Sequence, residues 1–321
     1  GMEAAPASLL MALAFVATPT LAVWSSENKW GDLDASSSGE AKSTVDIGLF
    51  AVAMPERLEH VRRFAKKNHL AVEIVDGVPA SSLNETFLQE TNQIRADYCA
   101  PTRAIALAKG HRGALRAFLD SDNEFGVIFE DDVMVSTIQA KNQVYGNRSI
   151  SEILQEISAT SDDLGWDLLN MGRCVDLCES DNVLHEVRGC KSVNIVDSPN
   201  PMCAHSYMVS RAGAEKLMRW TWPFFAVWDV MPILMHKLAK DQEFRMLSTT
   251  PRLFDQDRET VTDGLHNDSN PECDNSLATL YANNQRRHMK SAKMRWSDNS
   301  FLHEGTTGHR VCPKFVVNVP E

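Results

Sequence analysis

Two patterns of hydrophobic and polar residues alternate along the chain. Short apolar runs rich in Val, Ile, Leu and Phe predict buried strands, and stretches with apolar residues at every third or fourth position predict amphipathic helices. The predicted strands span 45–53, 70–75, 125–129, 166–172, 204–210 and 244–248, with two shorter strand-like runs at 183–187 and 192–196. The predicted helices span 55–67, 104–119, 149–158, 211–219 and 229–240. This alternation predicts an α/β domain with a central sheet flanked by helices.

In the stretch 125–135, with the sequence FGVIFEDDVMV, the predicted strand ends abruptly in Glu130, Asp131 and Asp132. One interpretation is an acidic turn that faces solvent, as most charge runs do. The preceding helix and short polar turn, however, complete an αβ unit of a nucleotide-binding type. Ligands of such sheets bind beyond the carboxyl ends of the strands, so the three carboxylates are also candidates to bind a hard divalent cation beside a phosphate ester.

Two other acidic positions have both a structural and a functional interpretation. Asp76-Gly77 follows the strand predicted at 70–75 and is either a simple turn or a contact to the base and ribose of a nucleotide, with Gly77 permitting close approach. Asp229 follows the aromatic-rich segment 220–228 and begins the helix predicted at 229–240. Asp is a favoured N-cap, but a carboxylate beside aromatic side chains also suits a sugar.

Three stretches resemble glycosyltransferase family 25, which includes bacterial lipooligosaccharide galactosyltransferases and animal collagen galactosyltransferases. They are ALAKGHRGALRAFLDSDNEFGVIFEDDV (106–133), WDLLNMG (166–172) and AHSYMVSRAGAEKLM (204–218). The resemblance covers roughly residues 45–263. It implies a GT-A-type nucleotide-sugar-binding fold with a central mixed, mostly parallel sheet.

The resemblance also implies a function. A hexose, galactose or glucose, would pass with inversion from a UDP-sugar or similar nucleotide-sugar donor to a hydroxyl of a glycan or protein acceptor. Asp229 would be the catalytic base. Manganese or magnesium would be bound by Glu130, Asp131, Asp132 and His266. The residues expected to bind the donor are Arg57, Asp76, Gly77, His111, Asp131, His205, Tyr207 and Gln256.

Alternatives remain open at this stage. His111 inside a helix and Tyr207 inside a strand are equally compatible with packed positions. Gly110 and Ala104 replace a Ser and a Glu of the family, which is compatible with a catalytically inactive carbohydrate-binding or scaffold protein on the same fold. The acidic strand end is also compatible with a metal-dependent phosphohydrolase.

The N-terminal and cysteine-containing segments indicate the secretory pathway. An apolar run at 9–23 predicts a signal peptide, with a short membrane anchor as the alternative, and a polar linker follows at 25–43. Four of the seven cysteines lie at Cys174, Cys178, Cys190 and Cys203. In a lumenal protein these predict at least one disulfide, which would pin an insertion at 173–203 that is poor in core residues, and a structural zinc site is the alternative. Three glycosylation sequons, at 84–86, 147–149 and 267–269, agree with a location in the endoplasmic reticulum or Golgi lumen or with secretion.

Composition limits the remaining classes. With 321 residues and 43% hydrophobic residues the chain can bury a large core, and we expect a catalytic domain at 44–266 and a C-terminal extension at 267–321. The net charge of -11 argues against a general nucleic-acid binder, which would need clustered Lys and Arg.

Overall fold

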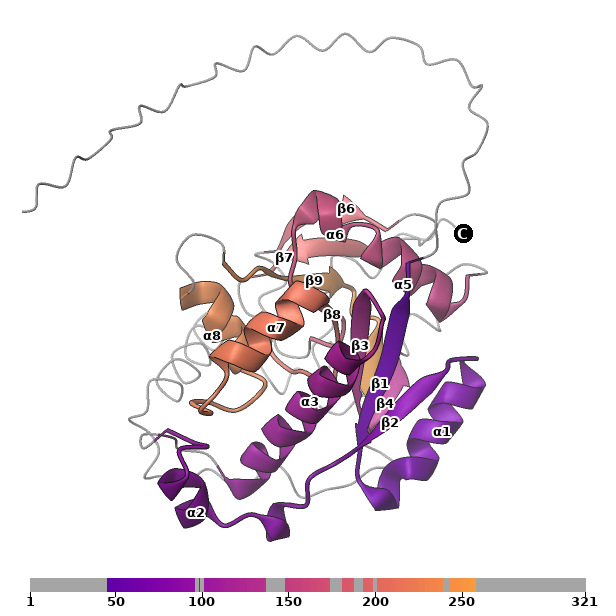
Figure 1. Cartoon of the computed structure of the whole chain (residues 1–321). Helices are drawn as coiled ribbons and strands as arrows, with labels where there is room; N and C mark the ends of the chain where they lie inside the picture. Colours follow the sequence, from indigo (N-terminus) through magenta and orange to yellow (C-terminus); the bar gives the residue numbers. More distant parts are fainter. Residues whose placement is uncertain are drawn as a thin grey trace, which may run out of the picture. The chain divides into compact units, whose positions relative to one another are not determined.

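The computed structural model describes residues 45–95, 98, 101–136, 148–173, 181–187, 193–198, 201–238 and 243–257. Its N-terminal part is a βαβ unit of strand β1 (Ile47–Ala53), the short helices η1 (Pro55–Arg57) and α1 (Leu58–Lys67), and strand β2 (Val72–Asp76). β1 and β2 are parallel, with Ala53 paired to Asp76. Helices η2 (Ala80–Ser82) and α2 (Glu85–Glu90) follow (Figure 1).

Helix α3 (Thr102–Asp120) crosses one face of the sheet and leads into strand β3 (Phe125–Glu130), which pairs in parallel with β1 (Figure 1). The close packing of α3 on β1 depends on Gly110. A Cβ atom at this position would lie 2.6 Å from Cγ1 of Val52. The residue that departs from the family pattern therefore has a packing reason of its own.

The central sheet contains eight described strands in the order β2-β1-β3-β8-β5-β9-β7-β6. Its remaining members are β5 (Leu168–Asn170), β6 (Asn182–Glu186), β7 (Asn194–Asp197), β8 (Ser206–Ser210) and β9 (Met246–Thr250). β5 and β9 are parallel, whereas β8 runs antiparallel between β3 and β5. The predicted fold class, a mixed central sheet flanked by helices, is confirmed.

A second small sheet lies next to the end of β3. Strand β4 (Val133–Val135) pairs antiparallel with β10 (Phe254–Gln256), and Gln256 is paired to Val133. The strand predicted from Phe125 thus ends at the acidic residues as expected, and a second strand, β4, follows them in another sheet. The acidic residues Asp131 and Asp132 form the turn between β3 and β4.

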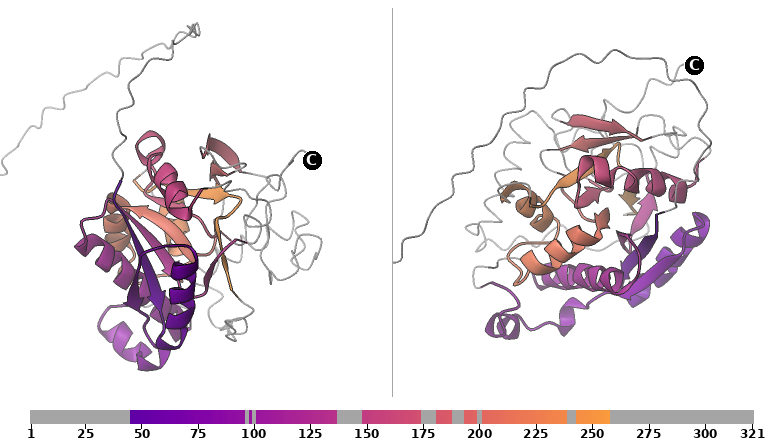
Figure 2. Two further views of the ribbon diagram at one scale, coloured as in Figure 1. Left: turned by 90° about the vertical axis from the view of Figure 1, so that its right-hand side faces the viewer. Right: turned by 45° about the horizontal axis from the view of Figure 1, so that its top comes forward.

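Helices cover both faces of the central sheet, as the two views in Figure 2 show. One hydrophobic cluster joins the sheet to α3, α7 (Arg211–Trp220) and α8 (Met231–Leu238), and the other joins it to α1 and α5 (Ile150–Ser158). Neighbouring residues of β3 divide between them, since Ile128 belongs to the first cluster and Val127 and Phe129 to the second. A strand buried on both faces reads as a continuous apolar run, which explains the pattern at 125–129. A short helix, α6 (Ser161–Leu164), precedes β5.

The cysteine-containing segment belongs in part to the central sheet. Strands β6 and β7 lie within it, and β7 pairs antiparallel with β9. Val187, Val193 and Ile195 are almost completely buried. The expectation that this segment is poor in core residues is therefore wrong.

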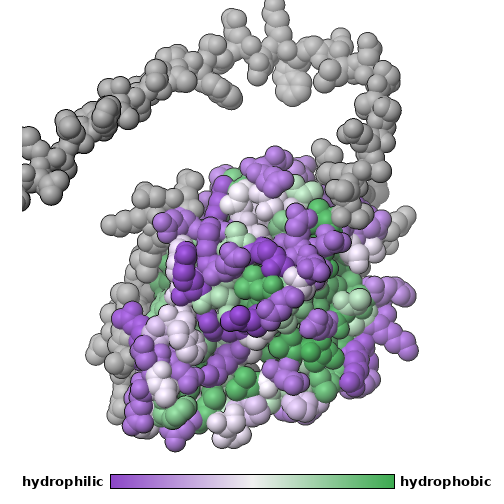
Figure 3. All heavy atoms as spheres, viewed as in Figure 1, coloured by the Kyte–Doolittle hydropathy of each residue, from purple (hydrophilic) through white to green (hydrophobic). Residues whose placement is uncertain are grey.

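The surface of the described part is mixed in character. Hydrophilic side chains are spread over the face seen in Figure 3, with smaller apolar areas between them. No helix among the described residues is both long enough and apolar enough to cross a bilayer. The predicted signal peptide or anchor, the linker and the C-terminal extension lie outside the described residues.

Candidate active site

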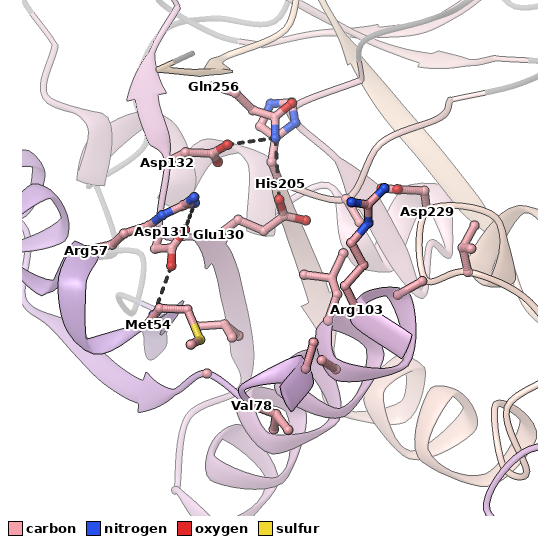
Figure 4. Close-up of a pocket in the computed structure, with 18 of the residues that line it drawn as sticks. Met54, Arg57, Val78, Arg103, Glu130, Asp131, Asp132, His205, Asp229 and Gln256 are labelled. Atoms are coloured by element: carbon pink, nitrogen blue, oxygen red, sulfur yellow. Dashed lines mark hydrogen bonds and ion pairs between the residues drawn. The ribbon is translucent and has the colours of Figure 1, made fainter. Parts of the chain in front are cut away.

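A cavity of about 600 Å³ lies at the carboxyl ends of the parallel strands β1, β2 and β3. Met54, Gly77 and Glu130 line it from these strand ends. Arg103 in the first turn of α3 and Asp229 before α8 also line it. The cavity thus lies at the edge where ligands of α/β sheets bind. Figure 4 shows how its labelled side chains are arranged.

The three acidic residues after β3 take different directions. Asp131 turns toward η1, where Oδ1 accepts a hydrogen bond from Nη1 of Arg57 at 2.8 Å and Oδ2 accepts one from the Met54 backbone N–H at 2.9 Å. The side chains of Arg57 and Asp131 are 20% and 11% exposed. Asp131 therefore anchors the segment after β1, in contrast to the expected cluster of three metal-binding carboxylates.

Glu130 and Asp132 converge on Gln256. Nε2 of this amide lies 3.0 Å from Oδ2 of Asp132 and 3.4 Å from Oε2 of Glu130, as the dashed lines in Figure 4 show. One nitrogen donor thus lies between two carboxylate oxygens that both line the cavity. Gln256, expected as a donor-binding residue, joins the cavity through these two contacts.

The described residues contain no group of three or more His, Cys, Asp or Glu side chains arranged to hold a metal ion. Two converging carboxylates are nevertheless a suitable donor set for a hard cation. Magnesium in nucleotide sites commonly takes one or two carboxylates and completes its shell with substrate phosphates and water. Glu130 and Asp132 fit this arrangement, and His266, predicted as a further ligand, lies outside the described residues.

Asp229 lies across the cavity from the acidic turn. Figure 4 shows its carboxylate and the guanidinium of Arg103 pointing toward each other. Helix α8 begins at Met231, so Asp229 belongs to the turn before the helix and is not its first residue. The N-cap position, directly before the first helical residue, is Val230.

His111 and Tyr207 are fully buried and do not line the cavity, in contrast to the donor contacts expected of them. Nε2 of His111 lies 3.3 Å from Oε1 of Glu130, and Nδ1 lies 3.3 Å from the Tyr207 hydroxyl. Burial lowers the pKa of His111 to about 3, although the charge of Asp229 opposes this shift. Burial likewise raises the pKa of Tyr207, so both side chains are neutral near pH 7.

Of the remaining residues that were expected to bind the donor, some line the cavity and others lie outside it. His205 and Gly77 line the cavity, whereas the neighbouring Asp76 is exposed outside it. A Cβ atom at Gly77 would lie 2.7 Å from Sδ of Met54 and 3.2 Å from the Ala53 backbone, so the close approach of strand ends favours glycine. Cys203 also lines the cavity and is disulfide-bonded. The other cysteines lie outside the described residues, so the predicted pairing stays a prediction.

Arg103 is one of the charged cavity residues that the sequence analysis missed, together with Glu56. Arg103 stands in the first turn of a 19-residue helix whose N-terminal end lines the cavity, beside Pro101 and Ala104. Helix N-termini favour anions, and a guanidinium there adds a charged donor. The signal in the sequence was a basic residue two positions after Pro101, at the start of the helix pattern.

Comparisons with known proteins give no family assignment. No family model and no curated protein matches the chain. Among solved structures, it is similar to A197 from STIV, with 16% identity, 64% of this chain and 81% of the other covered, and a TM-score of 0.34. A glycosyltransferase involved in the glycosylation of the major capsid of PBCV-1 has 12% identity, 71% and 98% coverage and a TM-score of 0.33.

A third similar structure is CMP:2-keto-3-deoxy-manno-octonic acid synthetase complexed with CTP. It shares 8% identity over 77% of this chain and 99% of the other, with a TM-score of 0.28. Similarities at these TM-scores do not establish a shared activity. The cavity is therefore the feature that indicates a function.

Proposed function

We propose that this protein is a metal-dependent glycosyltransferase that moves a hexose from a nucleotide sugar, with UDP-galactose and UDP-glucose as the first candidates, to a hydroxyl acceptor. One observation carries the proposal. Glu130 and Asp132, bridged by Gln256, share a cavity with Asp229 at the carboxyl ends of three parallel strands. An inverting sugar transfer of this kind needs residues that bind a cation and a separate carboxylate that acts as the base.

The donor would bind along the strand ends. Gly77 allows the base and ribose to approach the backbone beyond β2, and Arg103 at the start of α3 presents a guanidinium to the diphosphate. Glu130 and Asp132 would hold Mn²⁺ or Mg²⁺. Such an ion, when bound, neutralises the negative charge that develops on the leaving diphosphate.

Asp229 would act on the acceptor. Its carboxylate takes the proton of the acceptor hydroxyl while the hydroxyl oxygen attacks the anomeric carbon. The bond between that carbon and the diphosphate oxygen breaks in the same displacement, and the configuration inverts. The acceptor would be a glycan or a protein hydroxyl in the secretory pathway lumen, with the N-terminal segment as the means of any membrane association.

The test is a thermal-shift screen of nucleotide sugars with and without Mn²⁺, followed by assays of donor hydrolysis and transfer. A ligand at one hundred times its Kd stabilises the fold by about 2.7 kcal/mol, which is a clear rise in Tm. We expect such a rise with one UDP-sugar and Mn²⁺, together with hydrolysis that stops in EDTA.

Other outcomes identify the alternatives. Binding of nucleotide sugars without hydrolysis or transfer would support an inactive carbohydrate-binding protein. Metal-dependent cleavage of p-nitrophenyl phosphate, with no response to any nucleotide sugar, would support a phosphohydrolase.

A further inference from the structure

A buried chain of polar contacts leads from the interior to the cavity. The imidazole of His111 is fully buried between Glu130, Tyr207 and Trp228. The Trp228 ring stacks on it at a centroid separation of 5.1 Å and an interplanar angle of 8°. This stacking restricts rotation of the imidazole, so each ring nitrogen keeps its own neighbour.

These neighbours determine the tautomer. A neutral imidazole has a single N–H, and an ionised carboxylate can only accept a hydrogen bond, whereas a hydroxyl can donate one. The proton of His111 therefore resides on Nε2 and is donated to Oε1 of Glu130. Nδ1 then accepts the hydrogen bond of the Tyr207 hydroxyl, and both contacts are 3.3 Å long.

The Glu130 carboxylate connects this chain to the site. Oε1 faces the buried His111, whereas Oε2 faces Gln256 and, through the same amide, Asp132. The Glu130 side chain is only 15% exposed, and it lines the cavity. Because His111 contacts one carboxylate oxygen of Glu130 from the interior, the other oxygen points in a defined direction.

We propose that His111, held by Tyr207 and Trp228, is a positioning residue that orients Glu130 for cation binding. It would not touch the donor or the reacting atoms. The inference rests on the proposed function, because it assigns Glu130 a cation. Partners that orient a ligand in this way typically contribute a factor of 10 to 100 in metal affinity.

The experiment compares four forms of the full chain: wild type, His111→Leu, His111→Gln and the control His236→Leu. His236 is also a largely buried imidazole, but it contacts the backbone of Phe244 and Met246 and does not line the cavity. Mn²⁺ affinity is measured by electron paramagnetic resonance with UDP present, and Tm is measured for each form.

We expect His111→Leu to weaken Mn²⁺ binding by about 10- to 100-fold. His111→Gln should recover most of the affinity, because its amide can still donate to Glu130. The control should bind Mn²⁺ like wild type even if its Tm falls. In wild type, ¹⁵N resonances of His111 should show the Nε2–H tautomer, and Tyr207→Phe should retain it, because the Glu130 carboxylate can only accept a hydrogen bond from Nε2.

Wild-type Mn²⁺ affinity in His111→Leu, or an equal loss in His236→Leu, would overturn the positioning role. If wild type binds no Mn²⁺ yet hydrolyses a UDP-sugar, the positioning role and the metal dependence fail while the transferase activity survives. If wild type neither binds Mn²⁺ nor acts on any nucleotide sugar, both proposals fail.

Discussion

At the scale of single residues, three adjacent carboxylates acquire three different environments. Asp131 is tied to Arg57 and the Met54 backbone, Asp132 meets Gln256, and Glu130 connects Gln256 to the buried His111. Asp229, almost 100 positions further along the chain, lines the same cavity. Acidic residues with similar side chains therefore have different contacts and different roles in the proposed site.

The first residue-scale prediction concerns Asp229→Asn. The amide cannot accept the acceptor proton, so turnover should fall by about 10² to 10⁴-fold, the usual contribution of a positioned base. Tm and the Kd for the UDP-sugar with Mn²⁺ should change little. The measurements are steady-state transfer assays, thermal unfolding and isothermal titration calorimetry.

A matched control is Asp163→Asn, which makes the same chemical change at an exposed position of α6. This variant should keep wild-type turnover. Full activity in Asp229→Asn would rule out the assignment of Asp229 as the base.

At the scale of elements, α3 connects the core to the cavity. Its N-terminal turn carries Arg103, its middle packs on β1 at Gly110, and His111 follows directly. The absence of a side chain at Gly110 sets how closely the helix approaches β1. The helix position in turn sets the distance from His111 to Glu130.

The element-scale prediction is that Gly110→Ser, which restores the residue typical of the resembling family, destabilises this protein. The new Cβ would lie 2.6 Å from Cγ1 of Val52, and such overpacking costs about 1 to 3 kcal/mol. Urea unfolding would measure the loss. The double variant Gly110→Ser/Val52→Ala should be less destabilised than the sum of the two single variants, because Val52→Ala removes the clashing methyl groups. Strict additivity would contradict the packing explanation.

At the scale of the whole molecule, the sheet joins segments far apart in the sequence. β7 and β6, from the cysteine-containing segment, extend the sheet beyond β9. All described residues belong to one compact unit. We therefore expect substitutions that disrupt β7 to impair folding of the domain that contains the cavity.

The corresponding prediction compares two substitutions of apolar residues by Asp. Ile195 in β7 is fully buried, so Ile195→Asp places an unpaired charge in the core and should prevent folding or lower the unfolding free energy by roughly 4 kcal/mol or more. Val183 in β6 is 45% exposed, so Val183→Asp should change the unfolding free energy by only about 0.5 kcal/mol. Urea unfolding and circular dichroism give both values. Equal stability of the two variants would show that β7 is dispensable for the fold.

The sequence by itself determined most of the strands and longer helices and the strand edge where the cavity lies, but not the short helices α2 and α6. The spacing of apolar residues indicates whether a segment is buried on one face or on both. Residues close together in the sequence are enough to show this. It also identified Glu130, Asp132, His205, Asp229 and Gln256 as site residues, and all five line the cavity. An acidic strand end and a polar residue beside aromatic ones are visible without a structure.

Only the tertiary structure decided which way each side chain points. Asp131 is 77 positions from Met54, and Asp132 is 124 positions from Gln256, so no local pattern reveals these contacts. The burial of His111 and Tyr207 was likewise undetermined, because one face of α3 meets both the cavity and the sheet. A second strand, β4, follows the acidic turn because β10, far along the chain, pairs with it. The local chain allows each side chain several directions. Contacts with residues distant in the sequence determine which direction it takes.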